Sequence, residues 1–150
     1  MNIRRRTILL STILALGLTS AAQDKGAWRA MSNTARSITG DIAFSADKLS
    51  INYVPFTIAQ IRALQPAEVS AVFNDGTTGP GNLYRLSVPA SKVFLHHNTL
   101  CGSDETQWMI TYVDGKTLQL AFFSGPQIPA FTAEAIANST NLCGTYTYTR

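Results

Sequence analysis

Alternating hydrophobic and polar positions recur along most of the chain and predict a mainly β protein. Such runs lie at residues 40–45, 48–53, 83–88 and 142–149. Successive side chains of a strand point to opposite faces, so each run has one apolar face that favours burial. Turn-forming residues separate the runs, for example Ala46-Asp47 between the first two.

The clearest single element is a hairpin in which Asp114-Gly115 joins the runs 108–113 and 116–123. Asp-Gly between alternating runs is typical of a type I′ turn, which predicts positive φ at both residues and pairs Val113 with Lys116. The face predicted to be core carries Met109, Thr111, Val113, Leu118, Leu120 and Phe122. The opposite face carries Trp108, Ile110, Tyr112, Thr117, Gln119 and Ala121. Because this second face also holds large side chains, we expect cover on both sides, as in a closed barrel or where a ligand or another chain packs.

Helical patterns are confined to short segments. Residues 66–73 begin with proline and are followed by Asn-x-Gly, as expected of a short helix. Residues 132–137 predict a second helix with Thr132 as its N-cap. Residues 56–64 fit either a capping box or a strand, and we favour the strand. The predicted fold is therefore a single small antiparallel barrel or strongly curved sheet with one or two short helices.

The start of the chain has the pattern of an export signal. Three consecutive arginines precede an apolar stretch at residues 7–18. Ser20-Ala21-Ala22 then fits the small-x-small rule for cleavage after Ala22, with cleavage after Ala21 as the alternative. The apolar stretch is too short to span the roughly 30 Å hydrocarbon layer of a membrane. We expect a signal peptide at residues 1–22 and a single exported domain at residues 23–150.

This signal places the protein in the periplasm or outside the cell, with no stable membrane span after cleavage. The pair Arg5-Arg6 also resembles a twin-arginine signal, which implies folding before export. The export route therefore stays open between the general secretory and the twin-arginine pathways.

The charge balance changes once the signal is set apart. The whole chain has 12 basic and 9 acidic residues and a formal net charge of +3, and three of the basic residues are the arginines of the signal. The remaining chain carries nine charges of each sign, scattered singly. Nucleic-acid-binding domains usually present a basic patch or stripe, so we expect no nucleic-acid partner.

Cys101 and Cys143 are the two cysteines of the chain. An even number of cysteines in an oxidising compartment predicts a disulfide, here worth about 3–4 kcal/mol in the chain-entropy treatment. The alternative is a metal site, because His96 and His97 lie just upstream of Cys101. Adjacent residues of a strand point to opposite faces, and no second His or Cys stands at a zinc-like spacing. We therefore favour the disulfide and assign no metal ligand.

Gly26-Ala27-Trp28 follows the predicted cleavage site, and residues 40–45 begin the strand rhythm. This opening resembles that of lipocalin-like (calycin) barrels, which begin with a Gly-x-Trp whose tryptophan plugs one barrel end. A meander of strands and a disulfide tying the last strands would suit such a small exported barrel. The resemblance covers Gly26, Trp28 and the strand rhythm, and it implies the generic family role of binding a small apolar ligand.

The sequence lacks the common catalytic motifs. Gly-x-Ser-x-Gly, His-Glu-x-x-His, Cys-x-x-Cys and glycine-rich phosphate loops do not occur, and Asp104-Glu105 fits a solvated loop. We therefore predict a protein that is not an enzyme, with no catalytic residue and no cofactor.

Two roles remain for such a protein. One is binding a small apolar ligand or envelope component, and the other is inhibiting or neutralising another protein in the same compartment, as inhibitors and immunity-type proteins do. The candidate aromatic side chains, for ligand contact or for the core, are Trp28, Trp108 and Tyr112. The two roles differ in where apolar surface is placed, either around an internal cavity or outward on a loop.

Overall fold

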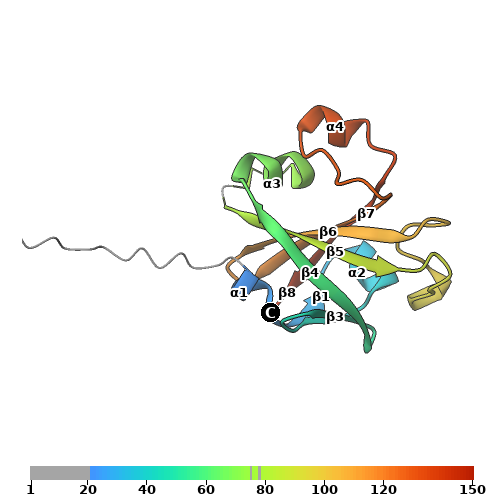
Figure 1. Ribbon diagram of the computed structural model, residues 1–150. Helices are drawn as coiled ribbons and strands as arrows, with labels where there is room; N and C mark the ends of the chain where they lie inside the picture. Colours follow the sequence, from blue (N-terminus) through green and yellow to red (C-terminus); the bar gives the residue numbers. More distant parts are fainter. Residues whose placement is uncertain (1–20, 75, 78) are drawn as a thin grey trace, which may run out of the picture.

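The protein is a closed barrel of eight antiparallel strands, in a computed structural model that describes residues 21–74, 76–77 and 79–150 (Figure 1). The strands follow one another around the barrel in chain order, and the last pairs with the first. They are β1 (Gly26–Ala30), β2 (Ile42–Phe44), β3 (Lys48–Ile51), β4 (Val54–Leu64), β5 (Gly81–Val88), β6 (Thr106–Asp114), β7 (Thr117–Ser124) and β8 (Leu142–Thr149). A short helix, α1 (Ala21–Asp24), precedes β1. The described connections contain the short helices α2 (Asn33–Ile38), α3 (Pro66–Phe73) and α4 (Ala133–Ala137) and a 3₁₀ turn, η1 (Leu95–His97).

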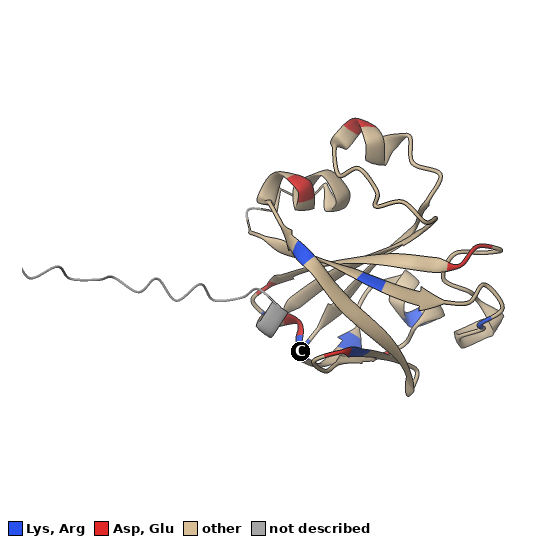
Figure 2. Cartoon of the chain, in the orientation of Figure 1, with Lys and Arg blue, Asp and Glu red and all other residues tan. Residues whose placement is uncertain are grey.

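The predicted signal peptide lies almost entirely outside the described residues, which begin at Ala21. Within the described ranges, no helix has the length and hydrophobicity needed to cross a membrane. Figure 2 shows charged residues of both signs scattered along the ribbon of these ranges.

Most elements lie where the sequence pattern predicts them. The ambiguous segment 56–64 is a strand, within β4, and α3 and α4 occupy the two predicted helical segments. Thr132 caps α4 as expected, because its side chain accepts a hydrogen bond from the backbone N–H of Ala135. Helix α2 was not predicted from the sequence. Its single fully buried residue is Ala35, so it lacks the periodic apolar face that marks a helix.

The predicted register of the β6–β7 hairpin is wrong by two residues. Val113 pairs with Leu118 instead of Lys116, and the two turn residues are Gly115 and Lys116 instead of Asp114 and Gly115. Of these turn residues only Gly115 has a positive φ, 56°, as in a type II′ turn with glycine at its first central position. A shift of two residues keeps each side chain on its face, so the predicted core face is confirmed.

Large side chains fill the barrel interior. Trp28, Phe122, Tyr146 and Tyr148 are all at most 1% exposed. The rings of Phe122 and Tyr146 meet edge to face with their centres 5.4 Å apart, an arrangement that adds to the energy of burial. The interior is therefore a packed core.

Both ends of the barrel are closed, and we name them after the helices found there. At the α1 end Trp28 closes the interior as predicted, and the guanidinium carbon of Arg150 lies 4.3 Å from the centre of its ring. At the α2 end Ala35 of α2 and two residues of the β5–β6 connection, Phe94 and Leu100, belong to the same buried cluster as the barrel interior. Buried side chains therefore occupy both ends of the described core.

A second hydrophobic cluster lies outside the barrel wall. Trp108 and Tyr112 on the outer face of β6 pack in it together with Val69 and Val72 of α3 and with Phe131, which precedes α4. Figure 1 shows α3 and α4 on one side of the barrel. The expected cover on both faces of the hairpin is confirmed, and the chain's own helices supply it.

Candidate functional site

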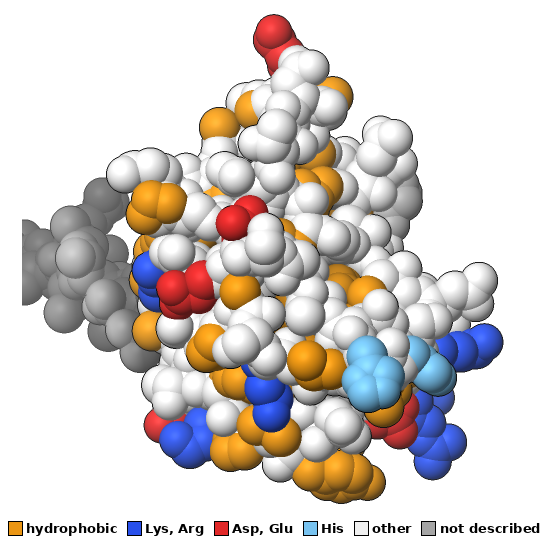
Figure 3. Space-filling view, turned by 90° about the vertical axis from the view of Figure 1, so that its right-hand side faces the viewer, with side chains coloured by type: hydrophobic (Ala, Val, Ile, Leu, Met, Phe, Trp, Pro, Cys, Tyr) orange, Lys and Arg blue, Asp and Glu red, His pale blue; other side chains and the backbone are white. Residues whose placement is uncertain are grey.

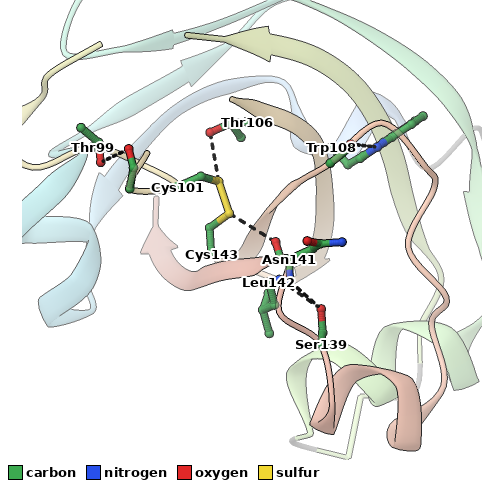
Figure 4. Close-up of a disulfide and its surroundings, with 10 residues drawn as sticks. Thr99, Cys101, Thr106, Trp108, Ser139, Asn141, Leu142 and Cys143 are labelled. Atoms are coloured by element: carbon green, nitrogen blue, oxygen red, sulfur yellow. Dashed lines mark hydrogen bonds between the residues drawn. A yellow bond between two sulfur atoms is a disulfide. The ribbon is translucent and has the colours of Figure 1, made fainter. Parts of the chain in front are cut away.

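Cys101 and Cys143 form the predicted disulfide (Figure 4). It joins the β5–β6 connection to β8 at the α2 end, with the two Cα atoms 4.9 Å apart. The hydroxyl of Thr106 donates a hydrogen bond to Cys101 Sγ at 3.1 Å, and the carbonyl oxygen of Asn141 lies 3.3 Å from Cys143 Sγ. Because the bond uses both thiols, the alternative of a metal held by the Cys101 thiolate is wrong.

His96 and His97 shape the loop that precedes the disulfide. Both are exposed and both have positive φ, 53° and 61°. The ring Nδ1–H of His96 donates to the carbonyl oxygen of Ser37 at 3.0 Å, and the side-chain amide of Asn98 donates to the same oxygen at 3.1 Å. These bonds attach the loop to the end of α2 and give the histidine segment a local structural role.

The three candidate aromatic residues do not form one site. Trp28 lies inside the barrel, and its indole N–H donates to the carbonyl oxygen of Asp24 at 2.8 Å. Trp108 and Tyr112 lie outside the barrel wall in the second hydrophobic cluster, where the guanidinium carbon of Arg85 stands 4.6 Å from the ring centre of Trp108. All three are at least nine-tenths buried, so their present role is packing.

Sequence reasoning missed a polar cluster at the α1 end, which we call the Asp24 cluster: Asp24, Asn82, Tyr84 and Thr111. Asp24 is only 2% exposed. Its Oδ2 accepts hydrogen bonds from the hydroxyl of Thr111 at 2.6 Å, the hydroxyl of Tyr84 at 2.7 Å and the side-chain amide of Asn82 at 3.1 Å. The available signal was the occurrence of Asn82 and Thr111 at core-facing positions of β5 and β6, where a buried polar group requires a partner.

The electrostatics of the Asp24 cluster follow from burial. Removal from water raises the pKa of Asp24 above its ordinary value, and the hydrogen bonds from Thr111, Tyr84 and Asn82 partly oppose that rise. Burial and the nearby Asp24 charge also raise the pKa of Tyr84 well above its usual range. Three side-chain donors hydrogen-bond to one carboxylate oxygen, so the cluster fixes α1 to the barrel.

A second feature missed by the sequence is the connection between β3 and β4, which we call the Tyr53 turn: Asn52 and Tyr53. Ile51 pairs with Val54, and φ is positive at both turn residues, 48° and 65°, as in a type I′ turn. Tyr53 is 98% exposed, so its ring gains almost no packing energy from the barrel. A β-turn of this type ordinarily has glycine at its second central position.

A shallow hollow on the outer surface adjoins the Tyr53 turn. It has a volume of about 390 Å³ and is lined by Ala27, Asp41, Ile42, Ala43, Ser50, Asn52 and Tyr53. The strand register explains its depth, because Ala27 pairs with Ala43, Ala43 with Ser50, and Ser50 with Pro55. Small side chains therefore follow one another across four strands, and the tyrosine stands at the rim.

The two sides of the barrel therefore differ in how far other elements cover their outer surface. The outer face of β5–β7 is covered by α3 and α4, whereas outward residues of β1–β4 such as Ala27, Ala59 and Ile61 are exposed. Figure 3 views the α2 end and shows hydrophobic side chains gathered along its lower rim, the region of the β3–β4 connection in Figure 1. Uncovered apolar surface next to a protruding aromatic ring is a common property of interaction sites.

No known protein family, curated protein or solved structure matches the chain. The eight-stranded antiparallel barrel is compatible with the lipocalin-like resemblance and consistent with a binding module.

Proposed function

We propose that this protein is an exported, non-catalytic binding module that inhibits or neutralises another protein through the Tyr53 turn and the adjoining hollow. The observation that carries the proposal is the contrast between the packed barrel interior and the exposed Tyr53 on the outer surface. The barrel interior is filled and closed at both ends, whereas Tyr53 is 98% exposed on a backbone conformation that disfavours tyrosine.

The conformation of Tyr53 supports a role outside the fold itself. A non-glycine residue in the left-handed region costs about 1–2 kcal/mol. Because the ring is exposed, packing within the described barrel offsets almost none of this free-energy cost. Strained residues of this kind cluster at functional sites, where a partner gains from a fixed side-chain position.

The chemistry of tyrosine also fits a protein partner. Tyrosine is enriched among the residues that contribute most to protein–protein affinity, because its rigid ring buries a large area and its hydroxyl offers one hydrogen bond. The neighbouring row of small side chains would let a partner approach the sheet closely. This combination favours a protein surface over a free small molecule.

The competing role is binding a small apolar ligand inside the barrel. Ligand pockets for such molecules typically have volumes of about 300–1,000 Å³ and are largely preformed. The side chains of Trp28, Phe122, Tyr146 and Tyr148 occupy the interior, so several would have to move before a ligand could enter. The interior therefore gives less support to this role than the outer surface gives to a protein partner.

Site-specific photo-crosslinking in the exported compartment tests the proposal. A photoreactive phenylalanine analogue replaces Tyr53 in one strain and Ile128, which is 50% exposed in the β7–β8 connection, in a control strain. We expect a covalent adduct of one defined mass from position 53 and none from position 128.

The affinity of the partner so identified supplies the quantitative check. Tyr53→Gly keeps a residue suited to the turn and should weaken binding at least tenfold, about 1.4 kcal/mol, whereas Ile128→Ala should leave it unchanged. Equal adducts from both positions, or equal affinities of both variants, would refute a site at the Tyr53 turn.

A further inference from the structure

We propose that the hollow beside the Tyr53 turn receives an arginine side chain of the partner protein, with Asp41 as its counter-charge and the ring of Tyr53 as its stacking surface. The inference rests on the proposed function, because it assigns the chemistry of the partner's contact at that same site. Its basis is the combination of a carboxylate, an aromatic ring and small polar side chains around one hollow of about 390 Å³.

Asp41 supplies an exposed carboxylate that the backbone holds in place. Its Oδ1 accepts a hydrogen bond from the backbone N–H of Ala30 at 2.8 Å, which ties the side chain to the end of β1. Neither of the ion pairs found within the described ranges includes Asp41. The carboxylate therefore keeps hydrogen-bonding capacity, and a negative charge, for a cation supplied from outside.

The strand register places the exposed Arg29 beside Asp41. Trp28 pairs with Ile42, so the next residue of β1 faces the residue that precedes β2. The two side chains nevertheless form no ion pair within the described part of the chain. An incoming cation would thus displace water from Asp41 without first breaking a salt bridge.

Tyr53 supplies the second half of the site. Its ring is 98% exposed, and the turn fixes its backbone at the rim of the hollow. A guanidinium group is attracted to the face of such a ring when it lies within about 6 Å of the ring centre. Because the group is planar, it can stack on the ring and still donate hydrogen bonds from its edge.

The other residues of the hollow suit the rest of an arginine side chain. The methyl groups of Ala27 and Ala43 offer apolar surface to its aliphatic stem, and Ser50 and Asn52 carry side-chain oxygens that can accept its remaining N–H groups. Lysine matches this arrangement less well, because its ammonium group is strongly hydrated and cannot stack as a plane. An anionic group would be repelled by Asp41.

NMR titration of the exported domain with small probes tests the inference before any partner is known. The probes are N-acetyl-arginine-N-methylamide, the citrulline analogue, which has the same shape but no charge, and the lysine analogue, all at equal ionic strength. The variant is Asp41→Asn, which keeps an oxygen to accept the Ala30 N–H and removes the charge. Asp104→Asn, which removes an exposed carboxylate from the β5–β6 connection, is the matched control.

We expect the arginine probe to shift the backbone amide signals of Asp41 and Tyr53 and to bind at least about threefold more tightly than the citrulline and lysine probes. Asp41→Asn should reduce binding of the arginine probe to the level of the citrulline probe, and Asp104→Asn should leave it unchanged. Equal binding of the arginine probe and either other probe to the wild type, or no shift at these two residues, would overturn the inference. The comparison of probes on the wild type does not depend on how the variant folds.

The partner captured at position 53 separates this inference from the proposed function. If Tyr53→Gly weakens the partner's affinity and Asp41→Asn does not, the binding site stands and the arginine contact is wrong. If no partner is captured while the arginine probe binds as expected, the hollow stands as a site for a guanidinium group and the proposed inhibitory role is wrong.

Discussion

Asp24 shows how one buried carboxylate fixes the start of a chain to its barrel. Its Oδ2 accepts hydrogen bonds from the hydroxyl groups of Thr111 and Tyr84 and from the side-chain amide of Asn82. These three residues lie on the inner faces of β5 and β6. These donors are buried, so loss of the acceptor leaves buried polar groups unsatisfied. The cluster therefore ties α1 to the barrel and sets a pH dependence.

The pH dependence of Asp24 has a definite sign. Burial raises the pKa of Asp24 above its ordinary value of 3.8, so the folded state holds the proton more tightly than the unfolded chain does. Its contribution to the free energy of unfolding is then largest below the unfolded pKa and falls as pH rises through the folded pKa. Asp24→Asn should remove this contribution to the slope.

Urea unfolding of wild type and Asp24→Asn from pH 3 to pH 8 measures the effect. The stability of the wild type relative to the variant should decrease with rising pH between the two pKa values and then level off. A difference that stays constant with pH would show that the pKa of Asp24 is not raised by folding.

Tyr146 and Tyr148 form a matched pair within β8. Both are almost fully buried, but the hydroxyl of Tyr146 has no hydrogen-bond partner among the described residues, whereas the hydroxyl of Tyr148 lies 2.7 Å from that of Thr39. Burial raises the pKa of Tyr146 to about 12, in keeping with an apolar setting.

Removing the two hydroxyl groups should therefore change the free energy of unfolding in opposite directions. Tyr146→Phe should raise the free energy of unfolding by about 1 kcal/mol, because an unsatisfied buried group is lost, and Tyr148→Phe should lower it by about 1 kcal/mol. Denaturant midpoints at neutral pH measure both. If Tyr146→Phe destabilises as much as Tyr148→Phe, the Tyr146 hydroxyl has a partner in solution.

At the scale of elements, neither of two tight hairpin turns follows the sequence pattern that usually specifies it. The Asp-Gly sequence does not form the predicted type I′ turn, because glycine shifts to the first central position and Lys116 takes the second. Asn52 and Tyr53 form a type I′ turn without glycine. The β6–β7 register differs from the predicted one by two residues, and a shift of two residues leaves the core face unchanged.

Replacing Tyr53 with glycine should raise the stability of the protein while it weakens binding of the partner. Tyr53→Gly should raise the free energy of unfolding by about 1 kcal/mol, because Asn-Gly suits both left-handed positions. Gly115→Ala, which adds a side chain at φ 56°, should lower it by about 1 kcal/mol. Thermal and urea unfolding compare the two variants. A loss of stability in Tyr53→Gly would mean that the tyrosine supports the fold itself.

At the scale of the whole molecule, the disulfide fastens the connection that covers the α2 end of the barrel. The bond between Cys101 and Cys143 spans 42 residues and links the β5–β6 connection to β8 at the α2 end. Replacing both cysteines with serine should lower the free energy of unfolding by about 3–4 kcal/mol. The measurement is urea unfolding, with the wild type under reducing conditions as the control. An unchanged midpoint would show that the loops hold the α2 end without the bond.

The barrel, the disulfide and the core face could be predicted from the sequence because they depend on alternation and residue type. Leu118, Leu120 and Phe122 point into the barrel core, and their alternation predicts this without knowledge of the turn type. The Asp24 cluster and the Tyr53 turn depend on contacts between distant segments and on backbone angles. Asp24 precedes the first strand with no local pattern, and a tyrosine at positive φ contradicts the usual preference, so neither was predicted.

Native mass spectrometry of the protein purified from its own compartment tests the central claim most directly, namely that the protein acts outward through the Tyr53 turn rather than inward around a ligand. The account predicts a complex with a second protein in the wild type, loss of that complex in Tyr53→Gly, and retention in Ile128→Ala. A small molecule of a few hundred daltons that stays bound to both variants alike, with no protein partner in the wild type, would contradict it.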